Sequence, residues 1–423
     1  MDIHDLQARG EVSRRDALRC ALGAFGLAAL GPIDRAMAAS RPLLPAVATQ
    51  KFLVVVELDG GNDALNMVVP QGLTNYTLRR PTIALGSAAT EPLDSGPHAT
   101  SQFRLNARMP QLAQMYRDGE VALVNRVGYP SANQSHDTSK AIWASGQREG
   151  LMTANGWIAR YAQLAAPTPL GAVSVRRGRH RALTGGSTNP LTLDSLGAFR
   201  FDTDTSFTNN HMLRLELVRE MLQARAASAT RDALLTGHEL AGRVASAVSG
   251  YSSSVTYGTS GINLAMRDIA MMLQAGFETR VFYTGFGGFD THAAQGSTTG
   301  SHGNLLAALD QALKAFADDC RAMGIWQNCV VAVMSEFGRR NFENGSAGTD
   351  HGGASCMLLT GGAVLGGLHG VAPSDEDLAQ SVLPYAVDFR AVYADILRDH
   401  LGLADTGGVF AEAFTSPVAV SVV

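Results

Sequence analysis

The sequence predicts an α/β fold built on a mostly parallel sheet that helices cover on both faces. Segments typical of strands and of helices alternate along the chain, which is the pattern of such sheets. The strand segments are continuous β-branched runs, as expected for strands that are buried on both sides. The chain has 423 residues, of which 46% are hydrophobic, so it can bury a core large enough for one large α/β domain.

The first predicted unit is a strand, a helix and a second strand. The β-branched run at 51–58 ends on the turn residues DGGND, which stop a strand. Apolar residues then recur at helical spacing in 106–118, and the strand VALVNRV follows at 121–127. A turn-rich loop leads to a further helix, which Ser135 or Thr138 could cap.

The rest of the chain contains an insertion and then repeats the alternation. Residues 165–260 contain a Gly/Pro/Thr-rich stretch and two predicted helices at 211–248. We therefore expect a helical and irregular insertion here, which ends in a flexible connection at 249–260. The later predicted elements are helices at 262–275, 302–323 and 389–401 and strands at 279–284, 329–334 and 355–359.

Residues 1–38 are predicted to be a twin-arginine signal peptide. Arg14 and Arg15 precede a short Gly/Ala-rich apolar run, and the small-residue cleavage site AMA follows at 36–38. The apolar run is shorter than the ~20 residues of a membrane-spanning helix, and its glycines disfavour the alternative, an amphipathic helix. We therefore expect the mature chain, 39–423, to be exported by the twin-arginine machinery to the periplasm or the medium, without a stable membrane anchor.

Charge and cysteine content exclude several classes of protein. The chain has 34 Lys and Arg against 38 Asp and Glu, a net charge of −4, so we expect no nucleic-acid partner. Its four cysteines lack CxxC spacing, which argues against a disulfide framework and a thiolate zinc site. The lack of CxxC, haem and dinucleotide motifs also disfavours an exported redox enzyme.

Acidic and imidazole side chains follow several predicted strands. Asp59 follows the first strand, Asp290 and His292 follow the strand after the insertion, and Glu336 follows the next one. Because ligands of open α/β sheets bind outside the carboxyl ends of the strands, we expect these side chains to converge. Asp290 and His292 would point the same way in extended backbone and could reach one metal ion or an adjacent pair. Asp290 could instead only cap a turn.

A second Asp/His pair, Asp350 and His351, lies between the glycines of GTDHGG. Adjacent side chains diverge, so this pair suits two neighbouring metal ions, or one ligand and one carboxylate that orients an imidazole. The two pairs together predict a metal or phosphate-type site. His302 and His369 are weaker candidates for the same site.

Ser135 and His136 are the candidate catalytic pair. They lie at a loop-to-helix junction, where the amides of the helix end could stabilise an attacking alkoxide or bind a phosphoryl group. Ser135 could equally be a helix cap. The sequence has no GxSxG elbow and no GxxxxGK[ST] loop, so hydrolases and kinases built on those motifs are excluded.

Several longer stretches, in a fixed order, match a known family. They are SRRDALR, VVVELDGGNDALNMVVP, NQSHDTSKAIWASG, GGFDTHAAQ, VVAVMSEFGRRNFENGSAGTDHGG and DFRAVYADIL. In these stretches the chain resembles twin-arginine-exported bacterial proteins of a domain of unknown function within the alkaline phosphatase and sulfatase-like superfamily. The resemblance spans almost the whole mature chain.

The resemblance implies a three-layer α/β/α sandwich that hydrolyses or transfers a phosphate, phosphodiester or sulfate ester of a small molecule or polymer. One or two divalent ions would assist, and zinc, manganese, calcium and magnesium all remain candidates. The resemblance matches Asp59 to a metal aspartate, Ser135 to the nucleophile and Asp290 with His292 to an Asp/His pair. The full set of candidates is Ser135, His136 and Arg339 for catalysis and Asp59, Asp290, His292, Glu336, Asp350 and His351 for the metal.

Two registers fit the end of this pattern. In one, Glu336 takes the place of an aspartate, Phe337 removes a histidine ligand and His351 is the final metal histidine. In the other, Asp350 and His351 are the Asp-His pair and His369 is the final histidine. The C/S-x-P/A-x-R stretch of formylglycine sulfatases is absent, which favours phosphate chemistry or a sulfatase of an unusual type. The alternative function is a non-catalytic envelope protein for binding or assembly that retains this fold.

Overall fold

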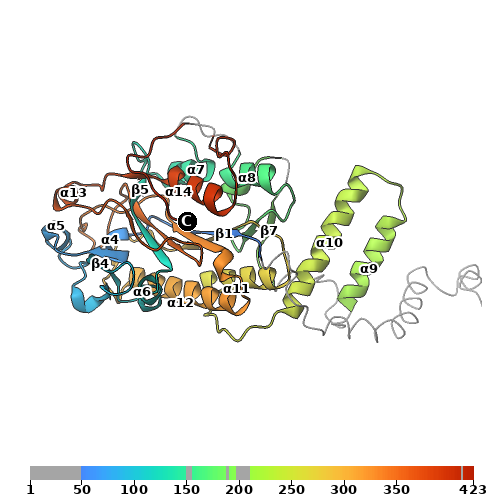
Figure 1. Ribbon diagram of the computed structural model, residues 1–423, viewed down its shortest axis with the longest axis horizontal. Coiled ribbons are helices and arrows are strands. Elements are labelled where there is room, and N and C mark those ends of the chain that lie inside the picture. The colour runs from blue at the N-terminus through green and yellow to red at the C-terminus, as the bar shows by residue number, and fades with distance from the viewer. Residues whose placement is uncertain (1–48, 149–154, 187–189, 197–209, 411–412) are drawn as a thin grey trace, which may run out of the picture. The chain divides into compact units, whose positions relative to one another are not determined.

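The computed structural model describes residues 49–148, 155–186, 190–196, 210–410 and 413–423 (Figure 1). The predicted signal peptide lies outside these residues. Most of the described chain is arranged around one large sheet.

The main sheet is mixed and mostly parallel. Its strands lie in the order β11-β5-β10-β9-β1-β8-β6-β7, and β12 pairs with the last residues of β5. They are β1 (Phe52–Asp59), β5 (Val121–Gly128), β6 (Ala172–Val175), β7 (Leu191–Leu193), β8 (Val281–Gly287), β9 (Cys329–Met334), β10 (Ser355–Thr360), β11 (Gly367–Gly370) and β12 (Val387–Asp388). The predicted mostly parallel sheet is thereby confirmed. The exception is β10, which runs antiparallel to both of its neighbours, β5 and β9.

A second, smaller sheet was not anticipated from the sequence. Its three antiparallel strands lie in the order β2-β4-β3. They are β2 (Val68–Pro70), β3 (Thr90–Leu93) and β4 (Thr100–Asn106). All three belong to the connection between β1 and the first long helix.

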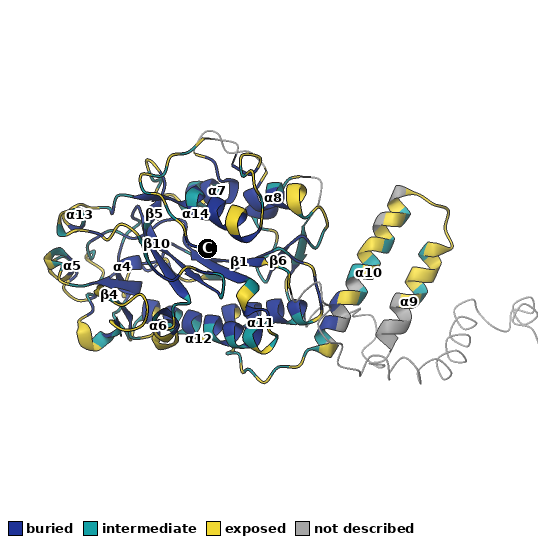
Figure 2. Ribbon diagram, in the orientation of Figure 1, coloured by how far each residue is buried: buried dark blue, intermediate teal, exposed yellow. Residues whose placement is uncertain are grey.

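Helices cover both faces of the main sheet, which gives three layers (Figure 1). The covering helices are α6 (Pro110–Arg117), α7 (His136–Ser145), α8 (Trp157–Ala165), α11 (Gly261–Gln274), α12 (Ser301–Ala322) and α14 (Phe389–Asp395). Leu53 and Val55 of β1 belong to a buried cluster with residues of α7, α8 and α14. Successive side chains of a strand point to opposite faces, so Phe52 and Val54 face the layer of α6, α11 and α12. Figure 2 shows that both helix layers turn buried sides to the sheet.

Aromatic stacking fixes α7, the helix that carries His136. Trp143 of α7 stacks on Phe389 with ring centroids 4.3 Å apart, and Trp157 of α8 stacks on Tyr393 at 4.5 Å. Large buried rings dominate core energetics. The position of α7 against the sheet is therefore set by the core rather than by the loop before it.

The shorter helical elements lie in the connections. They are α4 (Ala64–Met67), α5 (Thr74–Leu78), α13 (Asp375–Ala379), the 3₁₀ turns η1 (Ser87–Ala89), η2 (Arg181–Leu183) and η3 (Trp326–Asn328), and the π-helical turn η4 (Ile396–His400) that continues α14.

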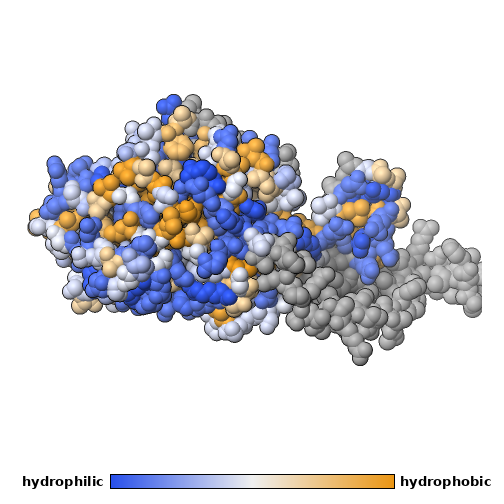
Figure 3. Space-filling model, viewed as in Figure 1, coloured by the Kyte–Doolittle hydropathy of each residue, from blue (hydrophilic) through white to orange (hydrophobic). Residues whose placement is uncertain are grey.

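The range 165–260 contains both sheet and helix. Its strands β6 and β7 extend the main sheet, so this part of the predicted insertion belongs to the sandwich. Its helices α9 (Asn210–Gln223) and α10 (Ala229–Gly250) pair with each other, and Arg243 of α10 lies 4.7 Å from the ring centre of Phe277. Figure 3 shows hydrophobic and hydrophilic residues mixed on the visible face of this pair. Exposed large apolar side chains on it include Val218, Met221 and Leu234.

The connection at 249–260, expected to be flexible, is fastened to α12. Three hydroxyl groups donate to the buried carboxylate of Asp319: Tyr251 at 2.5 Å, Ser253 at 2.8 Å and Tyr257 at 3.0 Å. Hydrogen bonds to a charged acceptor are the stronger kind. Asp319 of α12 therefore anchors three residues of this connection, and Gln274 and Asn263 of α11 (Gly261–Gln274) bind Ser252 and Gly258.

Two sequence expectations concern the chain as a whole. Cys320, Cys329 and Cys356 are free and buried, as expected of small core residues. No helix within the described ranges is both long and apolar enough to cross a membrane.

Two buried histidines make the stability of the protein depend on pH. Burial lowers the pKa of His302 and of His400 to about 4 each, whereas an unfolded histidine titrates near 6.5. Between these values the unfolded chain binds protons that the folded chain does not. The contribution of these two histidines to stability should therefore be constant above about pH 6.5 and fall as the pH drops toward 4, by on the order of 3 kcal/mol for each histidine.

Urea unfolding at several pH values measures this loss. The variant His400→Gln keeps a donor for the carbonyl of Phe52, which lies 3.0 Å from His400 Nε2, and it should unfold with a flatter pH dependence. The exposed His98 provides the control, because His98→Gln should leave the dependence unchanged. A wild-type slope in His400→Gln would contradict the prediction.

Candidate metal centre

The candidate site lies at the edge of the main sheet where the parallel strands end. Asp59 is the last residue of β1, Asp290 follows β8, and Glu336 follows β9. His136 begins α7, the helix after β5. His351 precedes β10, and because β10 is antiparallel to β9, its start lies at the same edge. Five segments that are distant in the sequence thus meet where ligands of α/β sheets bind.

Asp290, His292 and His351 meet at one point. Nε2 of His292 lies 2.9 Å from Nε2 of His351. Oδ1 of Asp290 lies 3.0 Å from the first nitrogen and 3.1 Å from the second. Asp290 and His292 therefore reach a common point, as their spacing predicts. Both side chains are partly exposed to solvent.

The other ring nitrogens decide which atoms carry hydrogen. Nδ1 of His292 lies 3.1 Å from Oδ1 of Asp350, and Nδ1 of His351 lies 2.7 Å from the carbonyl oxygen of Gln134. Both oxygens are acceptors, so each Nδ1 is the donor, and in a neutral imidazole Nε2 then presents a lone pair. Two nitrogen lone pairs and a carboxylate oxygen therefore face one another, an arrangement that a cation between them would stabilise.

His136 adds a third imidazole of the same kind. Its Nδ1 lies 2.8 Å from Oε1 of the buried Glu336, and its Nε2 lies 3.6 Å from Oδ2 of Asp290. One ligand atom each from His136, Asp290 and His351 lies within 4.8 Å of the others. Oriented Nδ1–H groups with Nε2 turned inward are typical of metal-binding histidines.

The donor set and its charge fit a divalent transition metal. Three imidazole nitrogens and one carboxylate oxygen suit zinc and its neighbours better than magnesium or calcium, which prefer oxygen. Burial lowers the pKa of His351, against the raising effect of Gln134 and Asp290, which favours its neutral form. Burial raises the pKa of Asp290, but the hydrogen bond and the positive charge of Arg339 outweigh it and bring the pKa to about 2.

Arg339 is buried beneath this cluster and positions it. Its guanidinium donates to the carbonyls of Gly60, Gly61 (2.6 Å) and Thr349 (2.6 Å) and to Oδ1 of Asp290 (2.5 Å). The side chain has no exposed surface, so it does not reach a substrate. Arg339 was predicted to be catalytic. Its contacts instead indicate that it positions Asp290 and the turn at Gly60 and Gly61.

The turn after β1 requires glycine at two positions. Gly60 and Gly61 have φ values of +123° and +82°, which glycine adopts at little cost. A Cβ on Gly60 would lie 2.4 Å from the backbone nitrogen of Asp290, and one on Gly61 would lie 2.4 Å from the Phe337 ring. The Phe337 ring packs against His351 with centroids 4.6 Å apart. Phe337 is therefore an apolar wall of the site.

Asp59 is paired with cations instead of facing the cluster. Its Oδ1 accepts from Nζ of Lys140, and its Oδ2 accepts from Arg177 at 2.9 Å. Burial raises the pKa of Asp59, but the hydrogen bond from Lys140 and the charge of Arg177 outweigh this effect and hold the pKa below its usual value. Asp59 was predicted to be a metal ligand, but these contacts indicate that it pairs with Lys140 and Arg177 instead.

Arg177 also reaches Glu57, a carboxylate buried within β1. Glu57 accepts from Arg177 at 2.7 Å and from the hydroxyl of Tyr283 at 2.8 Å, and His180 lies 3.3 Å away. Burial raises the pKa of Glu57, but His180 and Arg177 bring it to about 2. This polar network beneath the site was missed at the sequence level, because only a lone Glu57 in an apolar run signalled it.

Ser135 is the neighbour in sequence of His136, which belongs to the cluster. It directly precedes α7, its side chain makes no cap hydrogen bond, and the residue is exposed. It stands between Gln134, which orients His351, and His136. The side chain of Ser135 therefore does not form the hydrogen bond that a helix cap requires.

The remaining predicted residues fall outside the cluster. Asp350 accepts from His292 and from Asn344 (3.0 Å), so it orients an imidazole, as one of the two predicted alternatives has it. His302 is buried with Nε2 2.9 Å from Oδ1 of Asn62, and His369 lies on β11 with Nε2 2.7 Å from a carbonyl.

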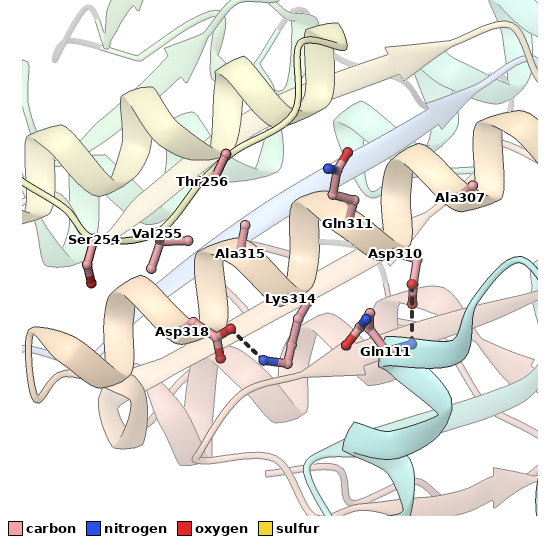
Figure 4. A pocket seen from close by; sticks show the side chains of 10 residues that line it. All are labelled: Gln111, Ser254, Val255, Thr256, Ala307, Asp310, Gln311, Lys314, Ala315 and Asp318. Carbon is pink, nitrogen blue, oxygen red and sulfur yellow. Dashed lines mark hydrogen bonds and ion pairs between the residues drawn. The ribbon is translucent and has the colours of Figure 1, made fainter.

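A pocket of about 590 Å³ lies elsewhere, between α12, α6 and the segment 254–256 (Figure 4). Both carboxylates that line it already have partners: Asp310 accepts from the backbone of α6, and Asp318 pairs with Lys314. None of its lining residues belongs to the candidate metal centre.

Comparison with known proteins gives distant similarity. No curated protein sequence matches the chain. A sulfatase from Pseudoalteromonas sp. is 10% identical over 87% of this chain and 71% of its own, with a TM-score of 0.38. The C-terminal periplasmic domain of EcEptC from Escherichia coli is 9% identical over 86% of both chains, with a TM-score of 0.36. The alkaline phosphatase from the Antarctic bacterium TAB5 is 10% identical over 78% of this chain and 96% of its own, with a TM-score of 0.30.

One family model covers the later part of the chain. The matched range includes Asp290, His292 and His351 but not His136. Residues 208–410 match the family described as "Protein of unknown function (DUF1501)".

Proposed function

We propose that the protein is a metal-dependent hydrolase that acts on a phosphate, phosphodiester or sulfate ester. The observation that carries the proposal is the convergence of three imidazole Nε2 atoms on the carboxylate of Asp290, with each Nδ1 tied to an acceptor. Such preorganised ligands at the carboxyl edge of an α/β sheet are typical of a metal site for catalysis.

The protein's own residues have two kinds of role in this proposal. His136, His292, His351 and Asp290 would hold one divalent ion, zinc being favoured by the nitrogen-rich donor set. When bound, such an ion supplies Lewis acidity toward an ester oxygen. Glu336, Asp350 and the carbonyl of Gln134 orient the three rings, and Phe337 keeps one side of the site dry.

Ser135 is the candidate nucleophile. Its hydroxyl is exposed, uncommitted to a helix cap, and adjacent in sequence to His136. The first amides of α7 point toward the same region and favour anionic oxygens.

The test combines metal analysis with hydrolysis assays. Full-length protein is loaded with Zn²⁺, and its turnover of p-nitrophenyl phosphate, bis-p-nitrophenyl phosphate and p-nitrophenyl sulfate is measured. We expect one of these esters to be cleaved and Ser135→Ala to lower kcat by at least about 100-fold, as removal of a nucleophile does. Thr138→Ala, in the first turn of the same helix, should retain activity.

Two outcomes would redirect the proposal. Full activity in Ser135→Ala would remove Ser135 from the reaction. A bound ion without cleavage of any of the three esters would favour the alternative function, a binding or assembly protein of the envelope.

The site of action is proposed to be outside the cytoplasm. Arg14 and Arg15 with the short apolar run after them support export by the twin-arginine machinery, which carries folded proteins that already hold their metal. The expected partners are therefore this machinery and a soluble or polymeric ester, with no nucleic acid.

A further inference from the structure

Two carboxylates that the sequence assigns to a metal, Asp59 and Glu336, lie on either side of the Lys140 ammonium group. Nζ of Lys140 donates to Oδ1 of Asp59 and lies 3.9 Å from Oε1 of Glu336. The side chains of Lys140 and Asp59 are about one quarter exposed, and Glu336 is buried. An ammonium group thus lies at the point where both carboxylates could share a cation.

The two carboxylates have little remaining capacity for a metal ion. Both oxygens of Asp59 are paired, one with Lys140 and the other with Arg177. Glu336 accepts from the backbone of Gly60 and Gly61, among other donors.

The further donors to Glu336 are the Ser335 hydroxyl at 3.1 Å and Nδ1 of His136 at 2.8 Å. A carboxylate offers about four lone-pair sites. Lys140 is not among these donors. It acts on Glu336 only through its charge, at 3.9 Å, while it occupies Oδ1 of Asp59 directly, so removing Lys140 would free that oxygen and leave the charge of Glu336 without this cation.

The fold delivers this ammonium group together with a ligand of the metal centre. Lys140 follows His136 by four residues on α7, and residues at that spacing lie on the same face of a helix. Glu336 contacts both, with the same Oε1 atom 2.8 Å from His136 Nδ1 and 3.9 Å from Lys140 Nζ. The charge of Lys140 is thus fixed next to the outer side of the His136 ring.

We infer that Lys140 takes the place of a second divalent cation between Asp59 and Glu336, so that the protein binds one ion at its histidine cluster and none at Asp59. The inference rests on the proposed metal centre for the identity of the first site. What it adds is that Asp59 and Glu336 do not bind a second metal ion while Lys140 is present.

A two-metal count tests this inference. Full-length protein is loaded with Zn²⁺, which suits the imidazole ligands, and is then dialysed against excess Mn²⁺, which suits carboxylates. Zinc and manganese are counted separately by mass spectrometry. We expect wild type to hold one zinc and no manganese, and Lys140→Met to hold one zinc and one manganese.

Matched variants assign the gained ion to this place. Lys140→Arg keeps the cation and should gain no manganese, and the double variant with Lys140→Met and Asp59→Asn should lose the gained ion. Lys314→Met removes the Lys314–Asp318 pair of α12, far from the site in the fold, and should gain none. If Lys140→Met does not fold, Lys140→Leu replaces it, because it too removes the charge and leaves Oδ1 of Asp59 without a donor.

The manganese count alone decides the inference. Manganese in wild type, or none in a folded Lys140→Met or Lys140→Leu variant, would overturn it. The zinc count decides the proposed centre separately, since a wild type without zinc would contradict that centre whatever the manganese count.

Discussion

His351→Ala should release the bound metal ion and abolish hydrolysis. The substitution removes a nitrogen that lies 2.9 Å from His292 Nε2 and 3.1 Å from Asp290 Oδ1. Loss of a residue that only orients a ligand costs about 10- to 100-fold in metal affinity, so loss of the ligand itself should cost at least about 100-fold. Zinc titration of the purified variant measures the affinity, and ester turnover measures the activity.

Two further variants make this result specific. Asp350→Asn should weaken zinc binding by about 10- to 100-fold, because the residue only orients His292. His369→Ala should change nothing, since His369 lies on β11 outside the cluster. Zinc affinity equal to that of wild type in His351→Ala would contradict the assignment of the ligands.

Arg339→Met should destabilise the protein by about 1–3 kcal/mol, the usual cost of leaving a buried hydrogen-bonding group without its partner. The substitution leaves the carbonyls of Gly60, Gly61 and Thr349 without their donor beneath the site, and unpaired buried acceptors are costly. It also frees Asp290, so zinc affinity should fall together with stability. Urea unfolding and zinc titration measure the two effects.

The neighbouring arginine provides the control for this variant. Arg340 has its guanidinium 5.6 Å from the ring centre of Phe342 and is less buried, so Arg340→Met should cost under about 1 kcal/mol. Equal losses in the two variants would show that Arg339 has no special role in holding the turn.

The fold could be predicted from the sequence to a large extent. The strand expected at 51–58 is β1, the helix expected at 302–323 is α12, and the strand expected at 329–334 is β9. These segments are long and strongly periodic or continuously apolar, so local pattern and burial agree. The small sheet β2-β4-β3 was missed, because β2 and β3 have only three and four residues and carry no such pattern.

The candidate site could be predicted only in part. Asp290, His292 and His351 were identified because Asp/His pairs beside glycines are unusual and stand near strand ends. His136 was assigned to catalysis, yet its Nε2 points at Asp290. Sequence spacing shows which residues could reach an edge of the sheet, but not which ring nitrogen faces inward.

The sequence by itself determined the mostly parallel sheet, the edge at which the chemistry lies and the two Asp/His pairs, because these follow from hydrophobic patterning and from where strands end. Only the tertiary structure decided that β10 reverses direction and brings His351 to that edge. It also decided that Lys140 and Arg177 neutralise Asp59 and that Arg339 is buried. The physical reason is that ion pairing and side-chain orientation depend on partners some 80 to 280 residues away, which no local pattern encodes.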